Sequence, residues 1–137
     1  MDRDEITAGV IECVARVVDA DAGALRADSV IVEDLGADSL DLLDLVFQLE
    51  QRFKIRIEPK GIERRAREAL GGASLDVDGV YTPEALAQLR NVMPEVSGEE
   101  LPDGLRTVDL PRRFRVATFV NIVERLLKEK EAAEGRS

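Results

Sequence analysis

The sequence predicts an all-α protein built as a small helical bundle. Apolar residues make up 45% of the 137 residues, but only 4% are aromatic and there is no Trp, so the core must consist of Leu, Val, Ile and Ala. Several segments place these residues at spacings of three and four, the period of an amphipathic helix. A chain of this length favours one hydrophobic core, so we expect a single domain spanning residues 1–137.

The first predicted helix runs from Asp4 to about Asp19. Cys13 falls inside its apolar stripe, so we interpret this residue as a small buried hydrophobe rather than a nucleophile. The stripe has the helical period and consists of Ile6, Val10, Val14, Val17 and Val18.

A long connection, residues 21–37, precedes the second predicted helix, Ser39–Phe53. Glycines and aspartates interrupt any period in the connection, apart from a short apolar patch at residues 30–32, and a connection of this length usually has a function. The helix has an apolar arc that we expect to be buried, a polar arc, and three apolar residues between them. The apolar arc consists of Leu42, Leu45, Val46, Leu49 and Phe53, and the polar arc consists of Asp41, Asp44, Gln48, Gln51 and Arg52. The apolar residues between the arcs are Leu40, Leu43 and Phe47.

Shorter elements are predicted after Pro59. A charged helix over residues 62–70 would be stopped by two glycines. Thr82 has the character of a helix cap, and Pro83 suits the first helical position, where its missing N–H costs nothing. This pattern predicts a helix that ends near Met93, before a proline.

The last predicted helix runs from Val116 to Glu129 and follows a polar loop at residues 97–104. Residues 131–137 are expected to form a disordered tail. The helix should pack through an apolar face formed by Phe119, Val120, Val123, Leu126 and Leu127.

Charge and composition argue against several classes of function. Nineteen basic and 28 acidic residues give a formal charge of −9, which repels nucleic acid and favours partners with basic patches. The absence of His and the single Cys remove the usual general base, zinc ligand and disulfide, so we expect neither an enzyme nor a metal site. No apolar stretch approaches the roughly 20 residues of a membrane span, and no secretory signal is evident. We therefore expect a cytoplasmic protein. We also expect it to be a monomer.

The most informative segment is Val32–Asp41, which reads Val-Glu-Asp-Leu-Gly-Ala-Asp-Ser-Leu-Asp. It resembles the phosphopantetheine attachment site of acyl carrier proteins, whose signature is a Gly, one residue, and then Asp-Ser-Leu. The resemblance covers about Asp4–Pro59 and Arg106–Lys130. It implies a four-helix-like bundle of acyl-carrier type, in which residues 60–105 form an extra, partly helical insertion.

The resemblance implies that Ser39 carries a 4′-phosphopantetheine arm, which a phosphopantetheinyl transferase takes from coenzyme A, and that acyl chains are bound to the arm as thioesters. A serine in the first turn of a helix exposes its hydroxyl, and the helix dipole favours a phosphodiester there by roughly 0.3–1 kcal/mol. Asp38 can cap the helix and Gly36 permits a tight entry, with Leu40 completing the expected cofactor-binding set. Taken alone, these residues also fit an ordinary helix cap.

The same resemblance implies that the helix 39–53 is a surface for acyl-transfer and condensing enzymes with basic docking patches. Its charge alone also fits an ordinary solvated face. Gln51 and Arg52 depart from the more acidic helix end that is usual in the family. The expected partner-binding residues are Asp41, Leu43, Asp44, Phe47, Gln48, Glu50 and Gln51.

The pathway and the role of the insertion stay open. The acyl pathway could be that of fatty acids, polyketides or a related product, and the alternatives are a peptidyl or aminoacyl carrier or an unmodified interaction or regulatory module. The insertion could be a lid, a docking surface or a stabilising appendage, with docking slightly favoured. Asp76–Tyr81 shares features with a calcium loop, but Ala85 occupies the bidentate position, so an Asp-Gly turn is the better interpretation.

Overall fold

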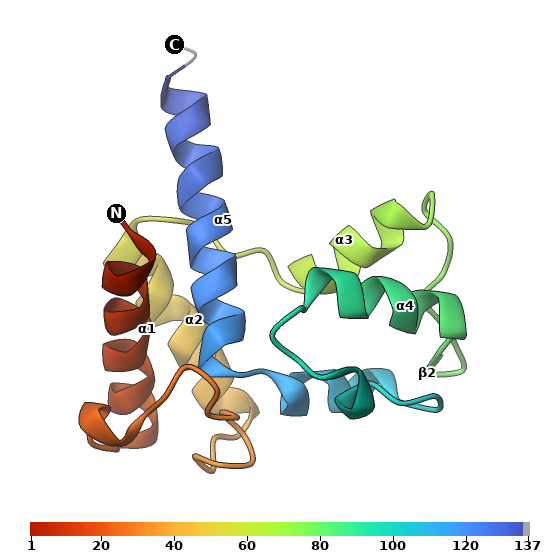
Figure 1. Cartoon of the computed structure of the whole chain (residues 1–137), viewed down its shortest axis with the longest axis horizontal. Helices are drawn as coiled ribbons and strands as arrows, with labels where there is room; N and C mark the ends of the chain where they lie inside the picture. The colour runs from red at the N-terminus through yellow and green to blue at the C-terminus, as the bar shows by residue number, and fades with distance from the viewer. Residues whose placement is uncertain (136–137) are drawn as a thin grey trace. The chain divides into compact units, whose positions relative to one another are not determined.

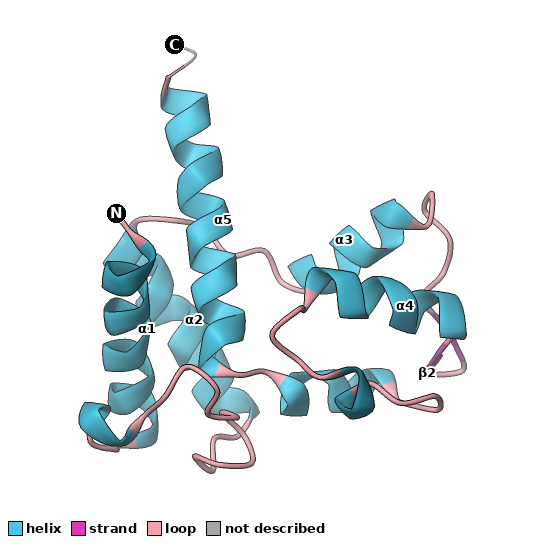
Figure 2. Ribbon diagram, in the orientation of Figure 1, coloured by secondary structure: helices cyan, strands magenta, loops and turns pink. Residues whose placement is uncertain are grey.

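The computed structural model describes residues 1–135, which form two compact units (Figure 1). The bundle unit comprises Met1–Ile57 and the chain from Arg115 onward, and the inserted unit comprises Glu58–Phe114. Nearly all regular structure is helical, with one short hairpin (Figure 2), which confirms the predicted all-α class with an extra segment. The single domain over residues 1–137 and the insertion limits 60–105 stay predictions.

Three long helices build the bundle unit. They are α1 (Arg3–Val18), α2 (Ser39–Phe53) and α5 (Val116–Glu134), and a short 3-10 helix follows α1 at Ala22–Ala24. Helix α1 packs against both α2 and α5, and α2 also contacts α5 (Figure 1).

The predicted bounds of α1 and α2 are confirmed to within one residue, but α5 continues beyond Glu129. Residues 131–134 are helical, so the predicted tail is wrong for them. The last two residues of that tail, 136–137, lie outside the described residues.

The core of the bundle unit follows the predicted apolar faces. Residues near the helix ends or the edges of these faces, such as Val17, Leu42 and Leu126, are half-buried rather than buried. A Cβ atom built on Gly9 would lie 2.7 Å from Cζ of Phe53, so the glycine allows α1 and α2 to approach closely. The buried side chains include Ile6, Val10, Cys13 and Val14 of α1, Leu45, Leu49 and Phe53 of α2, and Val116, Phe119, Val120 and Val123 of α5.

The inserted unit has its own small core around two short helices. Helices α3 (Gly61–Ala69) and α4 (Pro83–Val92) pack together, close to the predicted bounds. Thr82 caps α4 as predicted, because its Oγ1 accepts a hydrogen bond from the backbone N–H of Ala85 at 3.1 Å. The core also takes side chains from the connecting segments, and it includes Ile62, Ala66, Leu75, Tyr81, Leu86, Leu89, Met93, Leu101, Leu105 and Leu110.

An antiparallel hairpin of β1 (Asp76–Val77) and β2 (Val80–Tyr81) lies between these helices in the sequence. Asp78 and Gly79 both have positive φ angles, 52° and 82°, which is the pattern of a two-residue type I′ turn. This finding confirms the predicted Asp-Gly turn. Two further 3-10 helices, Gly98–Glu100 and Thr107–Arg113, complete the unit, the first of them inside the predicted loop 97–104.

Candidate functional site

Ser39 occupies the first helical position of α2, and its side chain is exposed. Asp38 immediately before it has an extended backbone, and its carboxylate accepts a hydrogen bond from the N–H of Asp41 at 2.9 Å. The carboxylate of Asp41 in turn accepts from the N–H of Asp38 at 3.0 Å, which completes a capping box. The cap predicted at Asp38 is confirmed, whereas the reciprocal bond from Asp41 was not predicted. These two bonds fix the turn that presents the hydroxyl.

The chain enters this turn through a compact loop. Gly36 has a φ of +73°, a conformation that favours glycine, and a Cβ atom there would meet nothing within 4 Å. Within the loop, the N–H of Gly36 donates to the carbonyl of Val32 at 3.0 Å, and that of Ala37 donates to the carbonyl of Ile31 at 3.3 Å. Ile31 and Ala37 are buried, while Asp38 and Ser39 are exposed. The loop is therefore anchored in the core directly before the exposed serine.

The start of α5 is hydrogen-bonded to an earlier part of the same connection, residues 27–30. The N–H groups of Val116 and Ala117 donate to the carbonyls of Ser29 and Ala27, at 3.0 and 2.8 Å. The guanidinium of Arg115 donates to the carbonyl of Asp28, and its backbone forms an antiparallel bridge with Val30. Sequence reasoning missed this connection, although the apolar patch at residues 30–32 was a signal that part of the loop is packed.

The apolar residues between the two arcs of α2 are the exposed large hydrophobic side chains of this helix. Leu40, Leu43 and Phe47 have 72%, 67% and 59% of their surface exposed. Their spacings of three and four place them in one row along the helix, beginning beside Ser39. A row of uncovered apolar side chains is typical of an interaction surface.

The polar residues predicted to face partners divide into two groups. Asp44 and Gln51 are exposed, whereas Asp41, Gln48 and Glu50 are half-buried. The carboxylate of Glu50 accepts a hydrogen bond from the N–H of Ile57 at 2.8 Å and so holds the chain where it leaves the bundle unit. One oxygen of Glu50 therefore has a structural partner within the chain.

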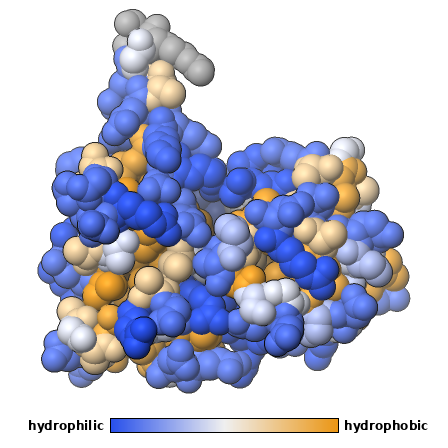
Figure 3. Space-filling view, in the orientation of Figure 1, coloured by the Kyte–Doolittle hydropathy of each residue, from blue (hydrophilic) through white to orange (hydrophobic). Residues whose placement is uncertain are grey.

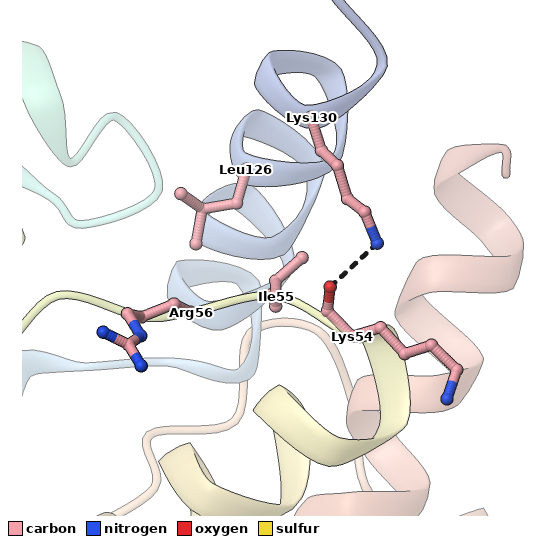
Figure 4. Close-up of a pocket in the computed structure, with 5 residues that line it drawn as sticks. All are labelled: Lys54, Ile55, Arg56, Leu126 and Lys130. Atoms are coloured by element: carbon pink, nitrogen blue, oxygen red, sulfur yellow. Dashed lines mark hydrogen bonds between the residues drawn. The ribbon is translucent and has the colours of Figure 1, made fainter. Parts of the chain in front are cut away.

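A shallow hollow of about 350 Å³ lies near the C-terminal end of α2, whereas Ser39 is at the other end of this helix. Figure 4 shows the residues that line it. It is lined by Ile55, Leu126 and three cationic residues, Lys54, Arg56 and Lys130. The Lys130 ammonium donates to the carbonyl of Lys54 at 3.0 Å, which satisfies a group at the helix end. The side chains of Lys54 and Arg56 point in different directions in Figure 4, so the cations do not converge on one point.

Other chemistry in the described residues is sparse. Burial raises the pKa of the Cys13 thiol, although Arg52 and Arg16 act in the opposite direction. The raised pKa favours the protonated, unreactive thiol. Within residues 1–135 there is no cluster of three or more potential metal ligands, and no helix is both long and apolar enough to cross a bilayer. Hydrophilic residues cover most of the face in Figure 3, with hydrophobic residues visible in patches.

Comparison with known proteins identifies the family to which the segment around Ser39 belongs. A family model described as "Phosphopantetheine attachment site" matches residues 8–63. An acyl carrier protein of Campylobacter jejuni (strain RM1221) is 43% identical over 61 residues, which are 44% of this chain and 74% of that protein. The chain belongs to the acyl carrier protein family. Members of this family are carriers rather than catalysts.

Other acyl carrier proteins show the same extent of similarity. One from Exiguobacterium sp. (strain ATCC BAA-1283 / AT1b) is 36% identical over 66 residues, covering 48% of this chain and 84% of its own length. One from Prochlorococcus marinus (strain MIT 9515) is 38% identical over 63 residues, covering 46% and 79%. No solved structure matches the chain. The family model ends at residue 63, so most of the inserted unit lies outside it.

Membership of the acyl carrier protein family implies a 4′-phosphopantetheine group, and the geometry at the start of α2 fits one. Ser39 presents an exposed hydroxyl at a helix N-terminus, where the dipole stabilises a phosphodiester. Gly36 leaves open space beside the loop, and the exposed Leu40 provides apolar surface next to the serine. When bound, such a group supplies a thiol on a long arm.

Proposed function

We propose that Ser39 is the attachment residue and that the arm's thiol holds acyl groups as thioesters for presentation to biosynthetic enzymes. The observation that supports this most is the contrast between the two serines within the matched residues 8–63. Ser39 is exposed in the first turn of α2, whereas Ser29 is half-buried and its Oγ accepts from the N–H of Arg26 at 3.0 Å. Ser39 is thus the more accessible nucleophile.

Attachment would form one P–O bond and break another. The Oγ of Ser39 attacks the phosphorus next to the pantetheine of coenzyme A, and adenosine bisphosphate leaves. The hydroxyl proton passes to a base of the phosphopantetheinyl transferase. Asp38 and Gly36 contribute by fixing the turn, through the cap and the positive φ, so that the hydroxyl is held where the transferase can reach it.

We infer that the exposed row on α2 is the docking surface for the transferase and for acyl-transfer and condensing enzymes. Leu43 and Phe47 offer apolar contacts, and Asp44 beside them offers a negative charge for a basic patch. Gln51 is the other exposed polar residue of the predicted partner-binding set. The remaining polar residues of this set, Asp41, Gln48 and Glu50, are half-buried and also belong to the proposed surface. Leu40 adjoins the serine itself. The pathway, that of fatty acids, polyketides or a related product, and a cytoplasmic location are part of this proposal.

Intact-mass measurement tests the attachment residue directly. The purified chain is incubated with coenzyme A and a promiscuous transferase, next to Ser39→Ala and the matched control Ser29→Ala. We expect one added arm on the wild type and on Ser29→Ala, and none on Ser39→Ala with an unchanged helical circular dichroism spectrum. An arm that persists on Ser39→Ala, or fails to appear on the wild type while a known carrier is modified in parallel, would overturn the assignment.

A further inference from the structure

The hairpin of the inserted unit exposes an apolar face that the unit itself does not cover. Val77 and Val80 are directly opposite each other in the register of β1 and β2, so their side chains share one face. Val80 also forms an antiparallel bridge with Arg106, and Val108 follows two residues later. The exposed fractions of Val77, Val80 and Val108 are 66%, 38% and 66%. We call these four residues, Val77, Val80, Arg106 and Val108, the valine face.

The fold fixes which side of these segments is exposed. The neighbours of the valine-face residues, Tyr81 and Leu105, are buried in the core of the unit, and the N–H of Tyr81 donates to the carbonyl of Leu105 at 3.0 Å. The N–H of Thr107 donates to the carbonyl of Gly79 at 2.9 Å, which ties the same segments at the next position. A shift of register by one residue would expose the buried side chains. The outward position of Val77 and Val80 is therefore a consequence of the fold.

A cation lies beside Val80 on the valine face. Arg106 is exposed, and it has no ion pair or side-chain hydrogen bond with any residue in the range 1–135. Asp78 is also exposed and follows Val77 in the turn at the end of the hairpin, whereas the backbone of Arg106 is bridged directly to Val80. The valine face thus combines apolar side chains with a positive charge.

The exposed row of α2 has the complementary character. It consists of Leu40, Leu43 and Phe47, with the exposed carboxylate of Asp44 adjacent. Apart from Met1, this row and the three valines contain all the exposed large hydrophobic residues in the described part of the chain. One surface therefore pairs apolar groups with an acid, and the other pairs apolar groups with a base, on the same polypeptide.

We propose that the valine face binds the α2 row of a second copy of this chain, with Arg106 of one copy against Asp44 of the other. Each copy carries both halves of the contact, so no further component is required. The contact is heterologous rather than symmetric, because different patches meet. With three apolar side chains on each surface it is far smaller than a stable interface, so it forms only at high protein concentration and leaves a monomer in dilute solution.

Nuclear magnetic resonance of the full-length chain at increasing concentration tests this contact. Amide spectra are recorded from about 20 μM to about 1 mM, a range that reveals weak association. We expect concentration-dependent shifts at the valine face and at the α2 row together. The variants are Arg106→Glu and Asp44→Arg, and Arg67→Glu is a control that makes the same charge change at an exposed α3 residue outside both surfaces.

The charge reversals provide the decisive comparison. Each variant alone places like charges against each other, so its concentration-dependent shifts should fall at least several-fold, while Arg67→Glu keeps them. An equimolar mixture of the two variants places opposite charges against each other again and should restore the shifts. The proposal is overturned if the wild-type spectra do not change with concentration, if only one of the two surfaces shifts, or if the mixture behaves like the separate variants. Spectra of the separate variants in dilute solution show whether both are folded.

Discussion

The bundle unit and the inserted unit reach a buried core by different routes. The bundle unit packs three helices of 16, 15 and 19 residues through continuous apolar faces. The helices of the inserted unit have only 9 and 10 residues, and side chains from its connecting segments, such as Leu75 and Leu101, are buried as deeply as those on the helices. Helices this short are marginal alone. The inserted unit therefore depends more on contacts that close loops, and the bundle unit more on helix faces.

The starts of α2 and α3 show the same contrast locally. The first turn of α2 is held by the reciprocal bonds of Asp38 and Asp41. Helix α3 begins after Lys60, which has a φ of 56° and makes no side-chain cap. Its first turn is instead linked by exposed ion pairs from Arg64 to Glu58 and Glu68, which stabilise little in water. Of these two first turns, the one held by side-chain caps is the turn of α2 that presents Ser39.

The largest expected loss of stability comes from truncating a buried leucine in either core. Leu49 of α2 and Leu89 of α4 are both fully buried, so Leu49→Ala or Leu89→Ala should each lower the free energy of unfolding by about 2–5 kcal/mol. Leu43→Ala is the matched control on an exposed position and should change it by less than about 0.5 kcal/mol. Urea denaturation followed by circular dichroism measures all three.

The same variants test the prediction of a single domain. Cys13 is the only cysteine and lies in the bundle unit, and Tyr81 is the only tyrosine and lies in the inserted unit, so each unit contains one spectroscopic or chemical probe. If residues 1–137 unfold as one domain, thiol accessibility and tyrosine absorbance must change in one coincident transition in every variant. Separate transitions, with each substitution shifting only its own probe, would contradict the single domain.

The next largest loss of stability is expected from crowding the close contact between α1 and α2. In Gly9→Ala the new Cβ would lie 2.7 Å from Cζ of the buried Phe53, and the crowding should cost about 1–3 kcal/mol. Gly23→Ala is a suitable control, because its Cβ would approach the nearest atom, Oδ1 of Asp21, only to 3.6 Å. Adding Phe53→Leu to Gly9→Ala should recover part of the loss in a double-mutant cycle. A Gly9→Ala variant as stable as the wild type would show that the helices separate easily.

Particular residues show where sequence reasoning succeeds and fails. The ends of α2 and the cap at Asp38 could be predicted because periodicity and capping are local properties. The reciprocal bond from Asp41 was missed because this position of a capping box usually holds Glu or Gln. The bonds from Ala117 to Ala27 and from Ile57 to Glu50 could not be predicted, since they join segments whose proximity depends on the folded chain. The exposed valines of the hairpin likewise depend on a register set by a distant segment.

Removing the α2 cap should have a smaller effect than crowding the helix contact. Asp38→Ala loses the side-chain bond to the N–H of Asp41 and should cost about 1 kcal/mol of unfolding free energy. Asp38→Asn keeps an acceptor and should behave nearly as the wild type. If the cap positions Ser39, Asp38→Ala should also reduce the rate of arm attachment more than a matched loss of stability from Gly9→Ala does. Equal attachment rates in these two variants would limit Asp38 to a purely structural role.

At neutral pH, Tyr81→Phe is expected to change the free energy of unfolding least, because the phenol is uncharged at this pH in both the folded and the unfolded chain. Burial raises the pKa of the Tyr81 hydroxyl above its ordinary value, and the nearby carboxylates of Glu63 and Asp76 add to this. The unfolded chain therefore loses this proton first, so stability present below about pH 10 should fall as the pH rises further. Tyr81→Phe should flatten that decline in urea denaturation at alkaline pH. Because Tyr81 is the only tyrosine, the absorbance of the native chain reports the ionisation of this residue alone. Ionisation in the pH range of an ordinary, exposed tyrosine would show that water reaches the core of the inserted unit.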